Sequence, residues 1–130
     1  MISVSVSIDV PNLDEGVRFY SSAFGFEKGA APIPGLVVMR AGDAELCILE
    51  KAAGTKPAQG SDDVRRYERH WTPVHIDIHV DDFASAIAKA IAAGAKREQL
   101  FEDARHGSVA FLSDPFGHGF CVIERKPRKS

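Results

Sequence analysis

Two stretches of the chain, residues 4–10 and 74–80, share one alternation of apolar and polar positions. In both, every second residue is Val or Ile, and Ser, Asp or His stand between them. Successive side chains of a strand point to opposite sides, so a period of two with one apolar face predicts a half-buried β-strand. The same strand pattern therefore occurs once in each half of the chain.

Each of these strands leads into a segment with helical spacing. Residues 12–25 and 81–94 begin with Asn or Asp, carry apolar residues three and four positions apart, and end on Gly. Asn and Asp cap helix N-termini and Gly ends helices readily, so both segments are predicted to be amphipathic helices. The candidate caps are Asn12 or Asp14 and Asp81 or Asp82, and the apolar stripes are Leu13, Val17, Tyr20 and Phe24 in the first helix and Phe83, Ile87, Ala90 and Ile91 in the second.

The two halves also end alike. Residues 46–52 read LCILEKA and residues 120–126 read FCVIERK, so the two cysteines of the chain occupy matching places. Each of these strands closes a hairpin, through an Ala-Gly-Asp turn in one half and an Asp-Pro-Phe-Gly turn in the other. Strand, helix and hairpin recur in the same order, which predicts two β-α-β-β-β units. The strands with the weakest pattern lie in residues 26–34 and 97–105.

Composition narrows the classes of partner. The chain has 130 residues, 45% of them hydrophobic and 26% charged, which is typical of one globular domain with a real core. Its net charge of −2 argues against nucleic acid and membrane surfaces as main partners. The N-terminus lacks the features of a signal peptide, so we expect a cytoplasmic protein whose cysteines are free thiols or ligands.

Three segments carry a resemblance to a known group of proteins. NLDEGVRFYSSAFGFE, HIDIHVDDF and FLSDPFGHGFCVIE follow or form the repeated elements, and together they resemble the vicinal oxygen chelate superfamily of glyoxalases, bleomycin resistance proteins and extradiol dioxygenases. The resemblance implies an α+β fold in which two βαβββ modules form a cupped mixed sheet around a cavity, with helices outside. One domain, residues 1–130, would contain modules at about 2–52 and 73–125 joined by a linker at 53–72. The resemblance also implies that a homodimer is common.

Strand phase indicates which side chains face the cavity. The helices need an apolar surface to pack on, so Val4, Val6 and Ile8 should meet the first helix and the opposite strand face should line the concave side. The same phase applies in the second copy and, by the repeat, in the last strand of each half. The residues expected to face the cavity are Ser3, Ser5, Ser7, Glu45, Cys47, Leu49, His75, Asp77, His79, Gly119, Cys121 and Ile123.

The resemblance places metal ligands on the first and last strands of each module, here at Ser5, Cys47, His75 and Cys121. Only His75 keeps the ligand type of metal-using relatives, and the two thiols replace carboxylates. Two thiolates and an imidazole suit zinc better than the usual divalent ions, and two simply buried cysteines are the alternative. Asp77 could orient His75 or bind a ligand, and His79 is too far along the strand to share an ion with His75.

The linker is unusually long for a compact domain. Asp62 or Asp63 could cap a short helix that continues to His70. Arg69 and Trp71 offer cationic and aromatic surface that could hold an anionic or aromatic ligand, pack against a dimer partner, or serve only as a crossover.

The function expected from the sequence is binding of a small molecule in the cavity, as in the bleomycin-binding branch, without the usual divalent metal. The first alternative is a metal-dependent lyase or dioxygenase of the glyoxalase type that uses His75. The second is a structural or regulatory dimer without a ligand. In all three, neither nucleic acid nor a membrane is an expected partner.

Overall fold

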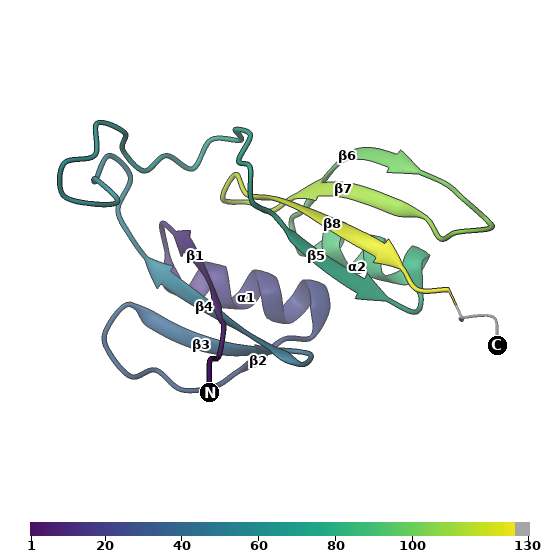
Figure 1. Cartoon of the computed structure of the whole chain (residues 1–130), viewed down its shortest axis with the longest axis horizontal. Coiled ribbons are helices and arrows are strands. Elements are labelled where there is room, and N and C mark those ends of the chain that lie inside the picture. The colour runs from purple at the N-terminus through teal and green to yellow at the C-terminus, as the bar shows by residue number, and fades with distance from the viewer. Residues whose placement is uncertain (127–130) are drawn as a thin grey trace. The chain divides into compact units, whose positions relative to one another are not determined.

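The computed structural model describes residues 1–126 of the chain, which divides into two compact units, Met1–Glu68 and Arg69–Ser130. The first unit contains β1 (Val6–Val10), α1 (Leu13–Phe24), β2 (Glu27–Lys28), β3 (Leu36–Ala41) and β4 (Ala44–Glu50). The second contains β5 (Ile76–Val80), α2 (Phe83–Ala93), β6 (Lys96–Phe101), β7 (Val109–Ser113) and β8 (Gly119–Glu124). Both units are βαβββ modules (Figure 1), so the predicted fold class is confirmed.

The two sheets have the same topology and the same register. Their strand orders are β1-β4-β3-β2 and β5-β8-β7-β6, with the first and last strands of each module parallel. Ser7 pairs with Cys47 in the first sheet, and Asp77 pairs with Cys121 in the second. The two cysteines therefore occupy equivalent positions, as the repeated sequence predicted.

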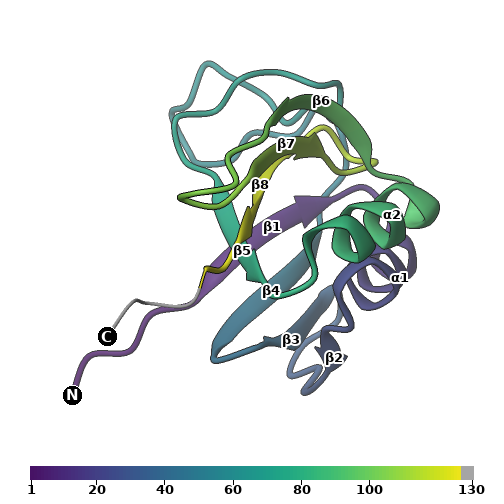
Figure 2. The same ribbon diagram turned by 90° about the vertical axis from the view of Figure 1, so that its right-hand side faces the viewer.

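Helix α1 covers one face of the first sheet (Figures 1 and 2). Asn12 is its N-cap and accepts a hydrogen bond from the Glu15 amide at 3.0 Å, and Gly25 ends it with a φ of 70°. A Cβ on Gly16 would lie 2.9 Å from Ile48 and 3.0 Å from Val10, so the missing side chain lets the helix approach the sheet closely. The buried helix face is Gly16, Phe19, Tyr20 and Ala23, and only Tyr20 of the predicted stripe is fully buried.

The predicted packing of the first strand is only partly correct. Ile8 and Val10 are buried, but Val4 is 83% exposed and Val6 is 42% exposed. The strand begins at Val6, and α1 packs mainly on β3 and β4, so the helix does not reach the start of β1. The residues before Val6 instead lead into the strand as an extended segment (Figure 2).

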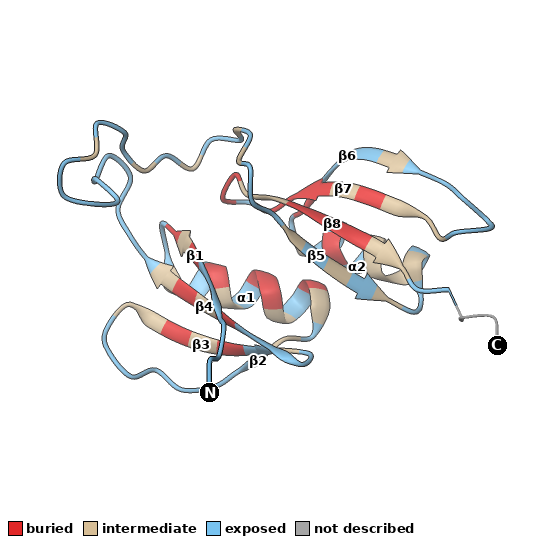
Figure 3. Cartoon of the chain, in the orientation of Figure 1, coloured by how far each residue is buried: buried red, intermediate tan, exposed pale blue. Residues whose placement is uncertain are grey.

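The second unit has a core of its own between α2 and β7–β8 (Figure 3). Asp82 caps α2 by accepting from the Ser85 amide at 3.1 Å, and Gly94 ends the helix. Leu112 and Val122 are among the most deeply buried side chains. Of the predicted apolar stripe of α2, Ala90 is buried, Phe83 and Ile87 are half-buried and Ile91 is exposed. Within the described residues, neither helix is long and apolar enough to cross a membrane.

The linker does not contain the predicted short helix. Asp63 accepts from the adjacent Val64 amide and pairs with Arg66, so its carboxylate does not cap a helical turn. Residues 53–68 fold back on the first unit instead, where the backbones of Thr55 and Arg65 are hydrogen-bonded. The side chain of Arg65 joins Asp9 of β1 at 2.8 Å, on the sheet face opposite α1.

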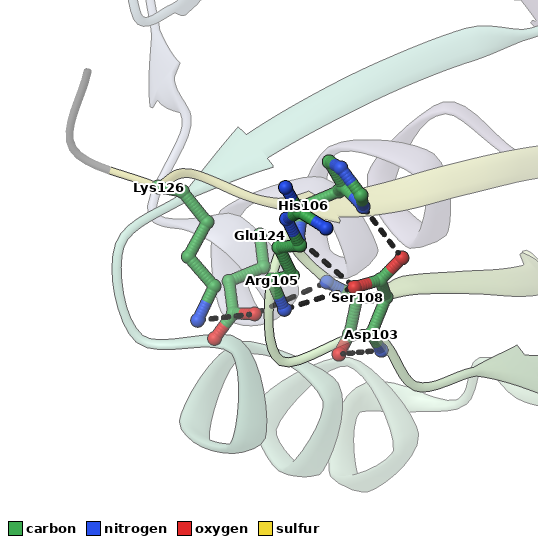
Figure 4. A network of polar contacts seen from close by, with 6 residues as sticks. All are labelled: Asp103, Arg105, His106, Ser108, Glu124 and Lys126. Carbon is green, nitrogen blue, oxygen red and sulfur yellow. Dashed lines mark hydrogen bonds and ion pairs between the residues drawn. The ribbon is translucent and has the colours of Figure 1, made fainter. Parts of the chain in front are cut away.

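The β6–β7 loop is held by a polar network (Figure 4). The Asp103 carboxylate accepts from the backbone amides of Arg105 and His106, both at 2.9 Å, and its other oxygen lies 3.1 Å from His106 Nδ1. The Ser108 hydroxyl accepts from the Asp103 amide, and the Ser108 amide donates to Glu124 of β8. Side chains thus satisfy the backbone groups of this exposed loop.

Candidate functional site

A cavity of about 310 Å³ lies in the second unit. Phe111 of β7 pairs with Cys121 of β8, and both line the cavity, so it is built on the sheet face opposite the buried side chain of Val122. Its walls come from strands β6 to β8 and from the segment that precedes β5. The lining residues are Arg69, Trp71, Thr72, His75, Glu98, Gln99, Phe111, Leu112, Gly119, Phe120 and Cys121.

One wall is an ion pair between Arg69 and Glu98. Arg69 Nε and Nη2 donate to the two Glu98 carboxylate oxygens at 2.7 and 3.0 Å, and Nη1 donates to the His70 carbonyl. The hydrogen bonds from Arg69 hold the pKa of Glu98 below its usual value, and those to Glu98 raise the pKa of Arg69. Gly119 lies beneath the guanidinium, which leaves no room there for a side chain.

The imidazole of His75 and the thiol of Cys121 line the cavity, and both contact the carboxylate of Asp77, which lies beside it. His75 Nδ1 lies 3.0 Å from Asp77 Oδ1 and 4.0 Å from Cys121 Sγ. Burial, followed by the negative charge of Asp77 and a hydrogen bond to it, raises the pKa of the Cys121 thiol to about 11. The same imidazole nitrogen faces both partners, so this is not the relay of a cysteine nucleophile, in which opposite ring nitrogens serve thiol and carboxylate.

These three residues are also the donor set that could hold a metal ion, with their ligand atoms all within 4.8 Å of one another. A thiol must lose its proton to bind a metal, and here both burial and Asp77 oppose that loss. Mn²⁺ and similar ions prefer carboxylate and imidazole ligands to a thiol. The set therefore does not fit the oxygen-rich divalent site of metal-using relatives, and only a thiophilic ion such as zinc would match it.

The cavity is lined by five of the residues singled out from the sequence: Arg69, Trp71, His75, Gly119 and Cys121. Asp77 lies beside them through its contacts with His75 and Cys121. His79 follows along β5 and is exposed.

Ile123 of β8 is half-buried and does not line the cavity, and the remaining sequence candidates belong to the first unit. Ser5 and Ser7 are exposed, and Cys47 is half-buried on β4. Glu45 lines a second hollow of about 470 Å³ near the β3–β4 turn, together with Arg40 and Asp43 among others.

Sequence reasoning missed Glu98, Gln99 and Phe111. The first two lie on β6, whose sequence KREQLF has no clear alternation, and the strand carries a register shift between Arg97 and Gln99. A pattern of period two cannot assign faces across such an irregularity. Phe111 has the right phase opposite Cys121, and that pairing is the one signal that would have found it.

The fold is shared by solved structures over nearly the whole chain, among them the following three. A variant of the fosfomycin resistance protein FosX from Listeria monocytogenes, in complex with Mn(II) and 1S,2S-dihydroxypropylphosphonic acid, is 16% identical, with a TM-score of 0.69 over 95% of this chain and 90% of that one. A glyoxalase/bleomycin resistance protein from Albidiferax ferrireducens is 18% identical, with a TM-score of 0.67 over 95% and 98%. Lactoylglutathione lyase from Agrobacterium tumefaciens is 17% identical, with a TM-score of 0.63 over 94% and 92%.

This architecture is that of the vicinal oxygen chelate superfamily, as the resemblance implied. The model of the glyoxalase-like domain matches residues 5–123, so the chain belongs to the glyoxalase-like domain family. No curated protein matches the sequence.

Proposed function

We propose that this protein binds a small organic molecule in the cavity of its second unit, without the divalent metal of metal-using relatives. The observation that carries the proposal is the cavity itself, where aromatic Trp71 and Phe111 stand beside the polar side chains of Thr72 and Gln99. Ligand pockets combine apolar walls with a few polar groups in this way, and about 310 Å³ accommodates a small molecule.

The metal-dependent alternative is a lyase or dioxygenase of the glyoxalase type. The observation that favours it is the grouping of His75, Asp77 and Cys121 at one point of the cavity. A bound divalent ion would supply Lewis-acid chemistry for an oxygen-bearing substrate. We rank it second because the thiol, with its raised pKa, stands where such relatives have a carboxylate.

One pair of measurements separates the two functions. Protein purified without a histidine tag is assayed for metal by mass spectrometry, and the same sample is screened against a small-molecule library by thermal shift. We expect little Mn²⁺, Fe²⁺ or Ni²⁺, together with ligands that raise the melting temperature in wild type and less in His75→Ala. About one zinc ion per chain, lost in His75→Ala and in Cys121→Ser, would instead support the metal site. Cys47→Ser shows whether the equivalent thiol of the first unit contributes to such a site.

The assembly and the cellular location belong to the same proposal. We infer a cytoplasmic homodimer in which modules at about residues 2–52 and 73–125 form one domain. Light scattering on the purified protein tests the oligomeric state. A stable dimer for which the whole library gives no ligand would favour the structural or regulatory alternative.

A further inference from the structure

The positive charge of the cavity is already neutralised within the second unit. Among residues 1–126, Arg69 is the one permanently cationic side chain that lines it, and Glu98 binds its guanidinium through two parallel hydrogen bonds. A third donor of Arg69 goes to the His70 carbonyl. Bidentate pairs of this kind are strong and directional, so the carboxylate of Glu98 offsets the positive charge that Arg69 would offer to an anion.

Apart from the Arg69–Glu98 pair, the charged groups at the site give a net charge that is negative or zero. Asp77 adds a carboxylate beside Cys121, and its partner His75 adds a positive charge only when it is protonated. The site therefore carries one net negative charge with a neutral imidazole and none with a protonated one. No protonation state of His75 makes it positive.

The aromatic side chains of the cavity also favour a cation. Trp71 lines the cavity and is 80% exposed, so much of its ring surface is open to a ligand. Phe111 lines it from β7 and packs edge-on against Phe101, with ring centroids 5.4 Å apart. The electron-rich faces of aromatic rings, above all of Trp, attract organic cations.

We propose that the ligand of this cavity is an organic cation with an apolar or aromatic body, which contacts Trp71 and Phe111 and is attracted by the negative charge of Asp77 beside the cavity. The inference rests on the proposed function and adds the chemical class of the ligand. It sets this chain apart from the FosX structure, whose bound molecule is a phosphonic acid. An anion of that kind would find Arg69 already paired and would face the carboxylates of Glu98 and Asp77.

The test uses three probes of similar size on the intact protein: benzyltrimethylammonium chloride, benzyl alcohol and sodium benzoate. Trp71 is the single tryptophan of the chain, so its fluorescence reports binding at the cavity. We expect saturable quenching by the ammonium probe, with a dissociation constant at least tenfold lower than that of benzoate. The difference should shrink in Asp77→Asn. Binding of benzoate as tight as that of the cation, or no saturable binding of the cation, would overturn the proposal.

A second variant tests the charge argument directly. Glu98→Gln frees the Arg69 guanidinium, so benzoate binding should tighten about tenfold or more while binding of the cation weakens. Glu102→Gln removes the same charge from an exposed residue that does not line the cavity, and it should leave both affinities unchanged. An unchanged preference in Glu98→Gln would show that Arg69 does not control ligand charge, against the proposal.

The outcomes separate this inference from the function on which it rests. If benzoate binds tightly and quenches Trp71, the cavity is a ligand site but the assigned charge is wrong. If none of the probes quenches Trp71 and the thermal-shift library also yields no ligand, the proposed binding function itself fails.

Discussion

The guanidinium of Arg69 lies directly over Gly119: a Cβ built on Gly119 would be 2.5 Å from Arg69 Nη2 and 3.0 Å from its Cζ. Because Glu98 and the His70 carbonyl fix the guanidinium, it cannot simply swing aside. The absence of a side chain at position 119 is therefore part of what shapes the cavity.

Gly119→Ala should break the Arg69–Glu98 pair. We expect the pKa of Glu98 to rise towards its ordinary value, measurable by NMR of the side-chain carboxyl, and a loss of about 1 kcal/mol of unfolding free energy. The control is a double-mutant cycle, because in an Arg69→Ala background the added methyl group meets no guanidinium. An equal cost of Gly119→Ala in both backgrounds would contradict this packing.

Cys121 should react slowly with alkylating reagents at neutral pH. A thiol with a pKa of about 11 is protonated at pH 7, and the thiolate is the reactive form. In a Cys47→Ser background, the rate of reaction with iodoacetamide should rise about tenfold per pH unit up to about pH 11. Asp77→Asn should move this profile to lower pH because it removes a negative charge next to the thiol, whereas Asp81→Asn, an exposed position, should not. A profile unaffected by Asp77→Asn would refute the contact.

Gly16→Ala should destabilise the first unit although alanine favours helices. The gain in helix propensity is about 1 kcal/mol, but the new methyl group would lie 2.9 Å from Ile48 and 3.0 Å from Val10. Overpacking of this kind costs about 1–3 kcal/mol. Urea unfolding should therefore give a lower midpoint for Gly16→Ala. Ser22→Ala, at an exposed position of the same helix, should be neutral or slightly stabilising.

The fold could be predicted from the sequence because its signals are local and occur twice. The caps Asn12 and Asp82 and the ends at Gly25 and Gly94 are in the predicted places. The equivalence of the two cysteines followed from the repeated last strand, and the strand registers bear it out.

What could not be predicted depends on contacts between distant segments. Asp63 satisfies a neighbouring amide and an arginine in place of starting a helix, and no local pattern distinguishes these uses of a carboxylate. The packed face of α1 is shifted because Gly16 allows a close approach to β4, a property of two surfaces together. Glu98 belongs to the site because it forms an ion pair with Arg69, and the two residues lie far apart in sequence.

The β6–β7 loop should lose its order in acid. Hydrogen bonds from the His106 amide, the His106 side chain and the Arg105 amide, in that order, hold the pKa of Asp103 below its usual value. A carboxyl with a lowered folded pKa stabilises the folded loop above its unfolded pKa of about 4, and that contribution is lost as the pH falls through the folded value. NMR shifts of the Arg105 and His106 amides should follow this titration. The step should vanish in Asp103→Asn and persist in Glu102→Gln.

Arg65→Ala should release the linker from the first unit. The guanidinium pairs with Asp9 at 2.8 Å and donates to Thr55 Oγ1 and to the Lys56 carbonyl, and its side chain is only 16% exposed. A partly buried arginine with several hydrogen bonds contributes about 1–2 kcal/mol to the free energy of unfolding, and Arg65 holds a loop in place rather than a core. We therefore expect faster limited proteolysis within residues 55–64, with a small shift in the unfolding midpoint. Arg66→Ala is the matched control, since the pair between Arg66 and Asp63 is exposed and local. The protease should cleave this variant at the wild-type rate. Equal cleavage rates for the two variants would show that Asp9 does not anchor the linker.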